Sequence, residues 1–220
     1  MHAQSADALY ANRENIADAR EAVRLWDDAL RKNPRGFDAA WKLARGDYWL
    51  GTHAPDAERR ASLERGIEAG RRASAIAPDL PEGHFWTAAN MGALAESYGL
   101  RAGLRYRKPI KEELETVLRL APAFMQGSAD RALGRWYFKV PRLFGGSHRR
   151  AIEHLQKSLT YNPKSTVSLY FLAEVLDDDG RKAEARGLLQ QVLDAPVDRD
   201  WAPEDRDYKA RASTLLAKLR

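Results

Sequence analysis

The apolar positions of this chain gather in stretches that each end at a proline. Pro34, Pro78, Pro122 and Pro163 close four such stretches and lie 44, 44 and 41 residues apart. After each proline a new aromatic-rich stretch with helical periodicity begins within about seven residues. Repetition at a fixed period predicts stacked helical hairpins, and such arrays present an extended concave surface.

The last of these stretches shows the hairpin pattern most clearly. Its apolar spacing predicts two helices, 166–178 and 181–194, joined by a turn at Gly180. The pair Leu172-Ala173 on the first helix resembles the large-then-small pair of tetratricopeptide repeats. The same register, carried back along the chain, predicts an all-α, tetratricopeptide-like helical-hairpin solenoid in one domain.

Five hairpins and one terminal helix account for the whole sequence. The predicted units cover residues 3–34, 37–78, 81–122, 125–163 and 166–196. A helix over 203–219 follows, because its apolar residues recur on one face while the other face is charged. Such a helix is expected to cap the exposed end of the array.

The three middle units are longer than a plain tetratricopeptide unit. The extra residues, 10, 10 and 7 of them, fall between the first and the second helix of each unit. Insertions at one repeat position map to one edge of an array. We therefore expect three loops side by side, at 51–55, 98–109 and 140–147, where function is often found.

Composition limits the classes of function. The chain has 220 residues, 44 % of them hydrophobic, which is enough for a continuous core. It has no cysteine, which excludes disulfides and thiolate metal sites. The formal charge of +5 is a mild excess, so we expect no nucleic-acid partner. The scattered histidines and the lack of a catalytic spacing predict a protein that is not an enzyme and has no metal or cofactor.

The sequence also bears on the compartment. No apolar run approaches the ~20 residues that span a bilayer, and no signal peptide is visible. The small, polar start fits a cytosolic N-terminus and a mature exported one equally well.

The concave face of the predicted array is rich in aromatic side chains. Aromatic residues with a few polar groups are typical of a groove for a small molecule or a peptide. Packing alone is the alternative for each single ring, although two adjacent helix residues can hardly both be buried in a two-layer array. The candidate ligand-binding residues are Trp41, Arg45, Tyr48, Trp49, Phe85, Trp86, Asn90, Trp136, Tyr137 and Tyr170.

Basic residues gather near the second and third insertions. Ser147 is a candidate N-cap for a helix whose first turn is basic, and the two glycines before it predict a positive φ or a close backbone approach. An acidic partner would relieve the conflict between these cations and the helix dipole; a solvated surface is the alternative. The candidate partner-binding residues are Arg105, Arg107, Phe144, Gly145, Gly146, Ser147, Arg149 and Arg150.

One segment carries a resemblance to a known family. Residues 134–147, in which three residues separate Pro141 from Gly145-Gly146-Ser147, look like the T component associated with TRAP transporters, the tripartite ATP-independent periplasmic uptake systems. The resemblance covers roughly 37–195. The rest of the pattern fits many helical repeats, including the microtubule-dynamics regulator family, which is similar in layout.

The resemblance implies a periplasmic accessory protein of solute uptake. It would engage the periplasmic solute-binding protein of the transporter, hold a small apolar or carboxylate ligand, and assemble as a homo-oligomer, often a trimer. The alternative is a generic tetratricopeptide scaffold, cytoplasmic, that binds a peptide or protein partner in its concave groove.

Overall fold

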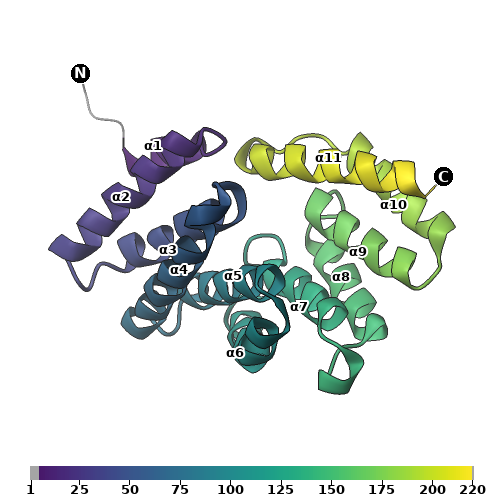
Figure 1. Cartoon of the computed structure of the whole chain (residues 1–220), viewed down its shortest axis with the longest axis horizontal. Helices are drawn as coiled ribbons and strands as arrows, with labels where there is room; N and C mark the ends of the chain where they lie inside the picture. Colours follow the sequence, from purple (N-terminus) through teal and green to yellow (C-terminus); the bar gives the residue numbers. More distant parts are fainter. Residues whose placement is uncertain (1–4, 220) are drawn as a thin grey trace. The chain divides into compact units, whose positions relative to one another are not determined.

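The computed structural model describes residues 5–219, with the backbone only at Leu100. Within this range the chain forms eleven α-helices, as predicted for an all-α fold (Figure 1). The first two residues of the first predicted unit, 3 and 4, lie outside the described residues. So does His2.

The helices divide into two compact units, where the sequence predicted one domain. The first unit reaches Ala121, and the second begins at Pro122, the proline that ends the third predicted repeat. The first unit contains α1 (Ala6–Ala11), α2 (Ile16–Lys32), α3 (Phe37–His53), α4 (Asp56–Ile76), α5 (Pro81–Ser97) and α6 (Gly99–Leu120). The second unit contains α7 (Ser128–Lys139), α8 (His148–Tyr161), α9 (Thr166–Asp178), α10 (Lys182–Asp194) and α11 (Ala202–Lys218), with 3₁₀ turns at Arg142–Phe144 and Arg199–Trp201.

Consecutive helices pair as hairpins inside each unit. In the first unit α3 packs on α4, and α5 packs on both α4 and α6. In the second unit α7 packs on α8, α9 on α10, and α11 on α9 and α10. The predicted helices 166–178 and 203–219 correspond to α9 and α11 almost residue for residue.

The ends of the helices follow local chemistry. The side chains of Ser5, Asn15, Ser147 and Ser165 each accept a hydrogen bond from a backbone N–H in the first turn of the helix that they precede. Pro81 opens α5, where a missing N–H costs nothing.

The prediction of three inserted loops is wrong for the first two. The chain passes from α3 to α4 through Ala54 and Pro55 alone, and the extra residues lengthen α4 to 21 residues. The second insertion is helical as well, because α6 begins at Gly99 and runs for 22 residues with Pro109 inside it. Only the third, between α7 and α8, is an irregular connection. Helix-forming residues and burial of the α6 core face outweigh the break that Pro109 would favour.

The core of the first unit depends on a close crossing of α4 and α5. A Cβ atom added at Gly66 would lie 2.4 Å from Asn90 Oδ1, and one added at Gly70 would lie 2.9 Å from the backbone nitrogen of Thr87. Real Cβ atoms essentially never come that close to another atom, so the two helices can approach this far only because both positions are glycine.

A buried carboxylate beside this crossing is paired with an arginine that is about half exposed. Asp47 of α3 is fully buried, and Arg65 Nε of α4 donates to its Oδ2 over 2.9 Å. Burial raises the pKa of Asp47 to about 6, although the hydrogen bond from the Arg65 guanidinium opposes the shift. The carboxylate is therefore held in place at a cost in desolvation.

Candidate functional site

A partly exposed face of α3 gathers three of the predicted ligand-binding residues. Trp41, Arg45 and Tyr48 are half-buried, and their spacing of i, i+4 and i+7 places them on one side of the helix. Leu43 and Leu50, on other sides of α3, are buried in the core. We call Trp41, Arg45 and Tyr48 the α3 face. It is the part of the predicted aromatic groove in the first unit that remains open to solvent.

Arg45 lies among aromatic rings. Its guanidinium carbon is 4.2 Å from the ring centre of Tyr10, 4.9 Å from that of Trp41 and 5.5 Å from that of Trp26. Cations above aromatic faces are stabilised by the ring quadrupole. The Arg45 side chain is consequently held in one place, with 22 % of it exposed.

A carboxylate from α1 completes this cluster. Asp7 Oδ2 lies 2.9 Å from Lys42 Nζ, and Asp7 Oδ1 lies 3.7 Å from Arg45 Nη2. Lys42 is also only 22 % exposed, whereas Asp7 is 57 % exposed. Two restrained cations thus converge on one solvent-facing carboxylate.

Six of the ten predicted ligand-binding residues are buried in the core instead. They are Trp49, Phe85, Trp86, Asn90, Trp136 and Tyr137. The expectation that Trp86 and Trp136 keep access to a groove is wrong, because they are 6 % and 9 % exposed. Asn90 holds the hairpins together by donating to the carbonyl oxygens of Ala44 and Trp86 over 2.9 and 2.8 Å.

The argument that adjacent aromatic residues cannot both be buried fails at Trp136-Tyr137. Tyr137 stacks on His154 of α8 with ring centres 5.3 Å apart. A Cβ atom added at Gly145 would lie 3.7 Å from the Trp136 ring, so the connection between α7 and α8 covers that ring. The sequence could not show that this inserted segment folds back over α7.

Tyr170 belongs to a second aromatic cluster, in the second unit. Its ring centre lies 5.4 Å from that of Tyr208 on α11, and Phe171 lies 5.6 Å from Tyr208. Arg135 of α7 lies over Phe171 and pairs with Glu174, over 2.5 Å. Burial raises the pKa of Tyr170. Sequence reasoning missed Phe171, Tyr208 and Arg135, because only the tertiary structure brings α7, α9 and α11 together.

The Gly145-Gly146-Ser147 turn has the conformation that the sequence predicts. Gly145 has a φ of +104°, and a Cβ atom at Gly146 would lie 1.6 Å from the carbonyl oxygen of Val140. Ser147 Oγ accepts from the backbone N–H of Arg150 over 3.3 Å, which confirms the N-cap. The two glycines are therefore required by the turn itself, whether or not a partner binds there.

The predicted basic residues fall into two kinds of environment. Arg149 pairs with Glu153 over 2.8 Å, and the guanidinium of Arg150 lies over the Tyr137 ring. On α6, in contrast, Arg101 and Arg105 are exposed and neither forms an ion pair with another of the described residues. The first half of α6 is thus the more available cationic surface. Arg107 is half-buried and Phe144 partly exposed.

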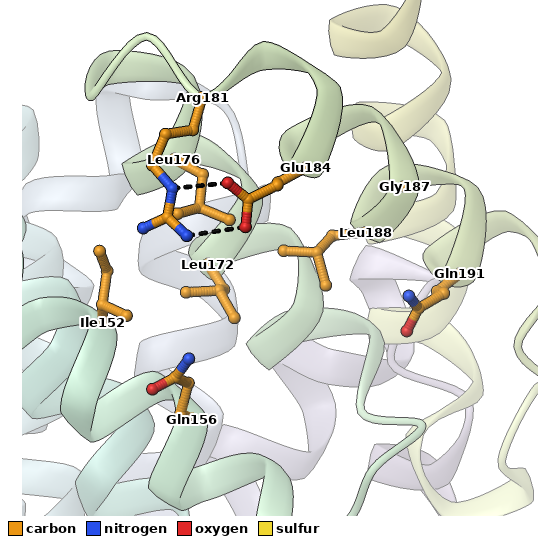
Figure 2. A pocket seen from close by; sticks show the side chains of 9 residues that line it. All are labelled: Ile152, Gln156, Leu172, Leu176, Arg181, Glu184, Gly187, Leu188 and Gln191. Carbon is orange, nitrogen blue, oxygen red and sulfur yellow. Dashed lines mark hydrogen bonds and ion pairs between the residues drawn. The ribbon is translucent and has the colours of Figure 1, made fainter.

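The second unit also has a shallow groove on α8, α9 and α10, which Figure 2 shows. Its volume is about 230 Å³. Leu172 and Leu176 of α9 belong to its apolar lining, and the Arg181–Glu184 ion pair lies at one end. The other lining residues are Ile152, Gln156, Gly187, Leu188 and Gln191.

The four histidines of the described residues have local partners. His84 lies 2.6 Å from Glu113, His148 lies 2.5 Å from Asp179, and His154 lies 2.7 Å from Asp130. His53 stacks on Trp49. Across residues 5–219, no group of three acidic or histidine side chains is placed to hold a metal ion. In the same range, no helix combines the length and the apolar character needed to cross a membrane.

Comparison with known families identifies the chain. The family described as Regulator of microtubule dynamics protein 1-3 matches residues 3–144, which is more than half of the sequence. The chain belongs to this family. A tetratricopeptide repeat family matches the remaining part, residues 145–219. Membership of the regulator of microtubule dynamics family agrees with the similarity in layout that the sequence suggested.

Solved structures support the same fold. A thermophilic tetratricopeptide protein of Thermus thermophilus superposes with a TM-score of 0.71 at 22 % identity, covering 96 % of this chain and 95 % of that one. The MamA structure gives 0.54 at 15 % identity over 96 % and 99 % of the two chains. The pilF protein of Pseudomonas aeruginosa gives 0.56 at 18 % identity over 97 % and 91 %. These identities establish the fold alone. No curated protein matches the chain.

The comparisons bear on the two interpretations of the sequence, a TRAP accessory protein and a generic tetratricopeptide scaffold. They support a tetratricopeptide scaffold of the kind that mediates protein–protein interactions, in families that are typically not enzymes. They give no support to a role in TRAP uptake, which rested on the residues around Gly145-Gly146-Ser147.

Proposed function

We propose that this member of the regulator of microtubule dynamics family is a scaffold without catalytic activity that binds a peptide segment of a partner protein on the α3 face. The observation that carries the proposal is the exposure pattern of α3. Trp41, Arg45 and Tyr48 keep part of their side chains open to solvent, whereas most other aromatic residues of the first unit are buried, namely Tyr10, Trp26, Trp49, Phe85, Trp86 and Tyr106.

Physical chemistry favours a peptide at such a face. Tyrosine, tryptophan and arginine dominate the energy of protein interfaces. The aromatic rings bury a large area at a low cost in conformational entropy, because each has only two χ angles. Tyr48 packs against Trp86, with ring centres 5.6 Å apart, so its ring is already ordered before a partner arrives. An ordered contact surface reduces the entropy lost on binding.

Selection from a random-peptide library displayed on phage tests the proposal. Peptides selected on the wild-type protein should lose binding to a Trp41→Ala, Tyr48→Ala variant, because truncating hot-spot residues costs ~2 kcal/mol or more each. An Arg71→Ala variant is the control, since Arg71 lies exposed on α4 and pairs only with Glu68 among the described residues. Selected peptides that bind both variants as tightly as the wild type would refute the α3 face as the site.

We propose that α6 assists by attracting an acidic partner surface. Arg101 and Arg105 are exposed, and Lys108 is paired with Glu112 only at 3.5 Å. Rim charges act mainly on the association rate. Replacing Arg101 and Arg105 by Glu should slow association and reduce its dependence on salt. Equal association rates for wild type and variant at low salt would show that this half of α6 is only a solvated surface.

A further inference from the structure

The Lys42–Arg45 pair on α3 has the properties of an anion receptor. Both side chains are about four-fifths buried, since each is 22 % exposed. The Arg45 guanidinium is fixed by Tyr10 and Trp41, at 4.2 and 4.9 Å, and Lys42 Nζ lies 5.7 Å from the Trp41 ring. Because the two cations are already restrained, a bound anion would meet a prepared site and order few further side chains.

The anion now at this site belongs to the chain itself. Asp7 is the carboxylate that contacts both Lys42 and Arg45, at 2.9 and 3.7 Å. Asp7 is more than half exposed, and ion pairs with an exposed member contribute little to stability because water competes for the charge. If the carboxylate of another molecule took the place of the Asp7 carboxylate beside Lys42 and Arg45, the protein would therefore lose little stability.

The element that carries Asp7 is short. The helix α1 has six residues, and a helix of this length is marginal by itself. Its place is secured by Leu9 and Tyr10, which are buried whereas Asp7 is exposed. The side chain of Asp7 can therefore leave the two cations while α1 keeps its packing.

We propose that Lys42 and Arg45 bind a carboxylate of the partner peptide, and that Asp7 occupies this subsite until the peptide displaces it. This inference rests on the proposed function, since Arg45 lies between Trp41 and Tyr48 on the α3 face. The peptide would place its carboxylate between the two cations and an apolar side chain against the neighbouring rings. Asp7 acts as a tethered competitor that lowers the affinity for weak acidic ligands.

Fluorescence anisotropy with defined peptides tests the inference. The acidic probe is fluorescein-labelled Gly-Ser-Gly-Leu-Phe-Asp with a free C-terminus. A second probe has the same sequence with a C-terminal amide, and a third has the amide and Asn in place of Asp. Comparison of the first two separates a C-terminal from a side-chain carboxylate. The peptide part of the third has no carboxylate, and the fluorescein label is the same in all three.

The expected result is specific to Asp7. Asp7→Asn should bind the acidic probe about three- to five-fold more tightly than the wild type, because it removes a competing exposed ion pair. Lys42→Gln, added to Asp7→Asn, should remove that gain. Glu68→Gln makes the same change of net charge on α4, away from the site, and should bind like the wild type. Circular dichroism should show that all variants keep their helices.

Three results would overturn the inference: no binding of the acidic probe to Asp7→Asn, equal affinity for the acidic probe and the probe without carboxylate, or equal tightening by Asp7→Asn and Glu68→Gln. Failure of the proposed function itself is distinguishable. If library peptides still depend on Trp41 and Tyr48 while Asp7→Asn has no effect, the scaffold function stands and only the masked carboxylate subsite is refuted.

Discussion

Replacing Gly70 by Ala tests whether the crossing of α4 and α5 is as close as the structure shows. The new Cβ atom would lie 2.4 Å from Thr87 Oγ1, 2.9 Å from Thr87 N and 3.1 Å from Thr87 Cα. The Thr87 hydroxyl cannot turn away freely, since it donates to the carbonyl oxygen of Gly83 over 2.7 Å. The helix backbone itself must therefore move.

Two opposing effects set the change in the free energy of unfolding of Gly70→Ala. Ala is favoured over Gly in a helix by ~1 kcal/mol. Overpacking of a core costs ~1–3 kcal/mol, and the upper end applies to Gly70 because the obstacle is backbone. We expect a net destabilisation of ~1–2 kcal/mol, which corresponds to a fall in Tm of ~2–8 °C for a chain of this size.

Thermal and urea unfolding, followed by circular dichroism, measure the effect. The matched control is Gly92→Ala on α5, where a Cβ atom would meet nothing within 4 Å. This control keeps the helix-propensity gain without the clash, so its stability should rise by up to ~1 kcal/mol. If Gly70→Ala is stabilised as much as Gly92→Ala, the close approach of α4 and α5 does not exist and our account of this core is refuted.

Three further changes have defined outcomes. Burial raises the pKa of Asp47 to about 6, so the folded state holds the Asp47 proton more tightly than the unfolded chain does. As pH rises from 4 to 7, the free energy of unfolding of the wild type, measured with urea, should therefore fall by up to ~3 kcal/mol relative to that of Asp47→Asn. A difference that does not change with pH would contradict this. Trp86→Ala and Trp136→Ala should each cost ~3–5 kcal/mol in urea unfolding, because both rings are buried; a loss below ~1 kcal/mol would mean that they are not core. Gly146→Ala should lower Tm, because its Cβ would overlap the Val140 carbonyl oxygen; an unchanged Tm would show that the turn tolerates a side chain.

The sequence predicted features that depend on residues close to one another along the chain. Apolar spacing located α9 and α11, because a helix is read from its own periodicity. Ser147 and the glycine turn before it were predicted correctly, since caps and positive φ are set by a few adjacent residues. The hairpin order and the all-α class follow from the same local signals.

Tertiary packing decided what the sequence could not. The spacing of an aromatic residue on a helix does not tell whether its ring lines a groove or fills a core. The tertiary structure buries Trp86 and Trp136 and leaves Trp41 and Tyr48 partly exposed. The first two sets of excess residues became parts of longer helices instead of loops, and these helices are held by the burial of their later turns, from Leu63 to Ala73 in α4 and from Tyr106 to Val117 in α6. Asp7 meets Lys42 and Arg45 across 35 and 38 positions of the chain, and contacts at such separations are set by how the hairpins stack, which no local pattern encodes.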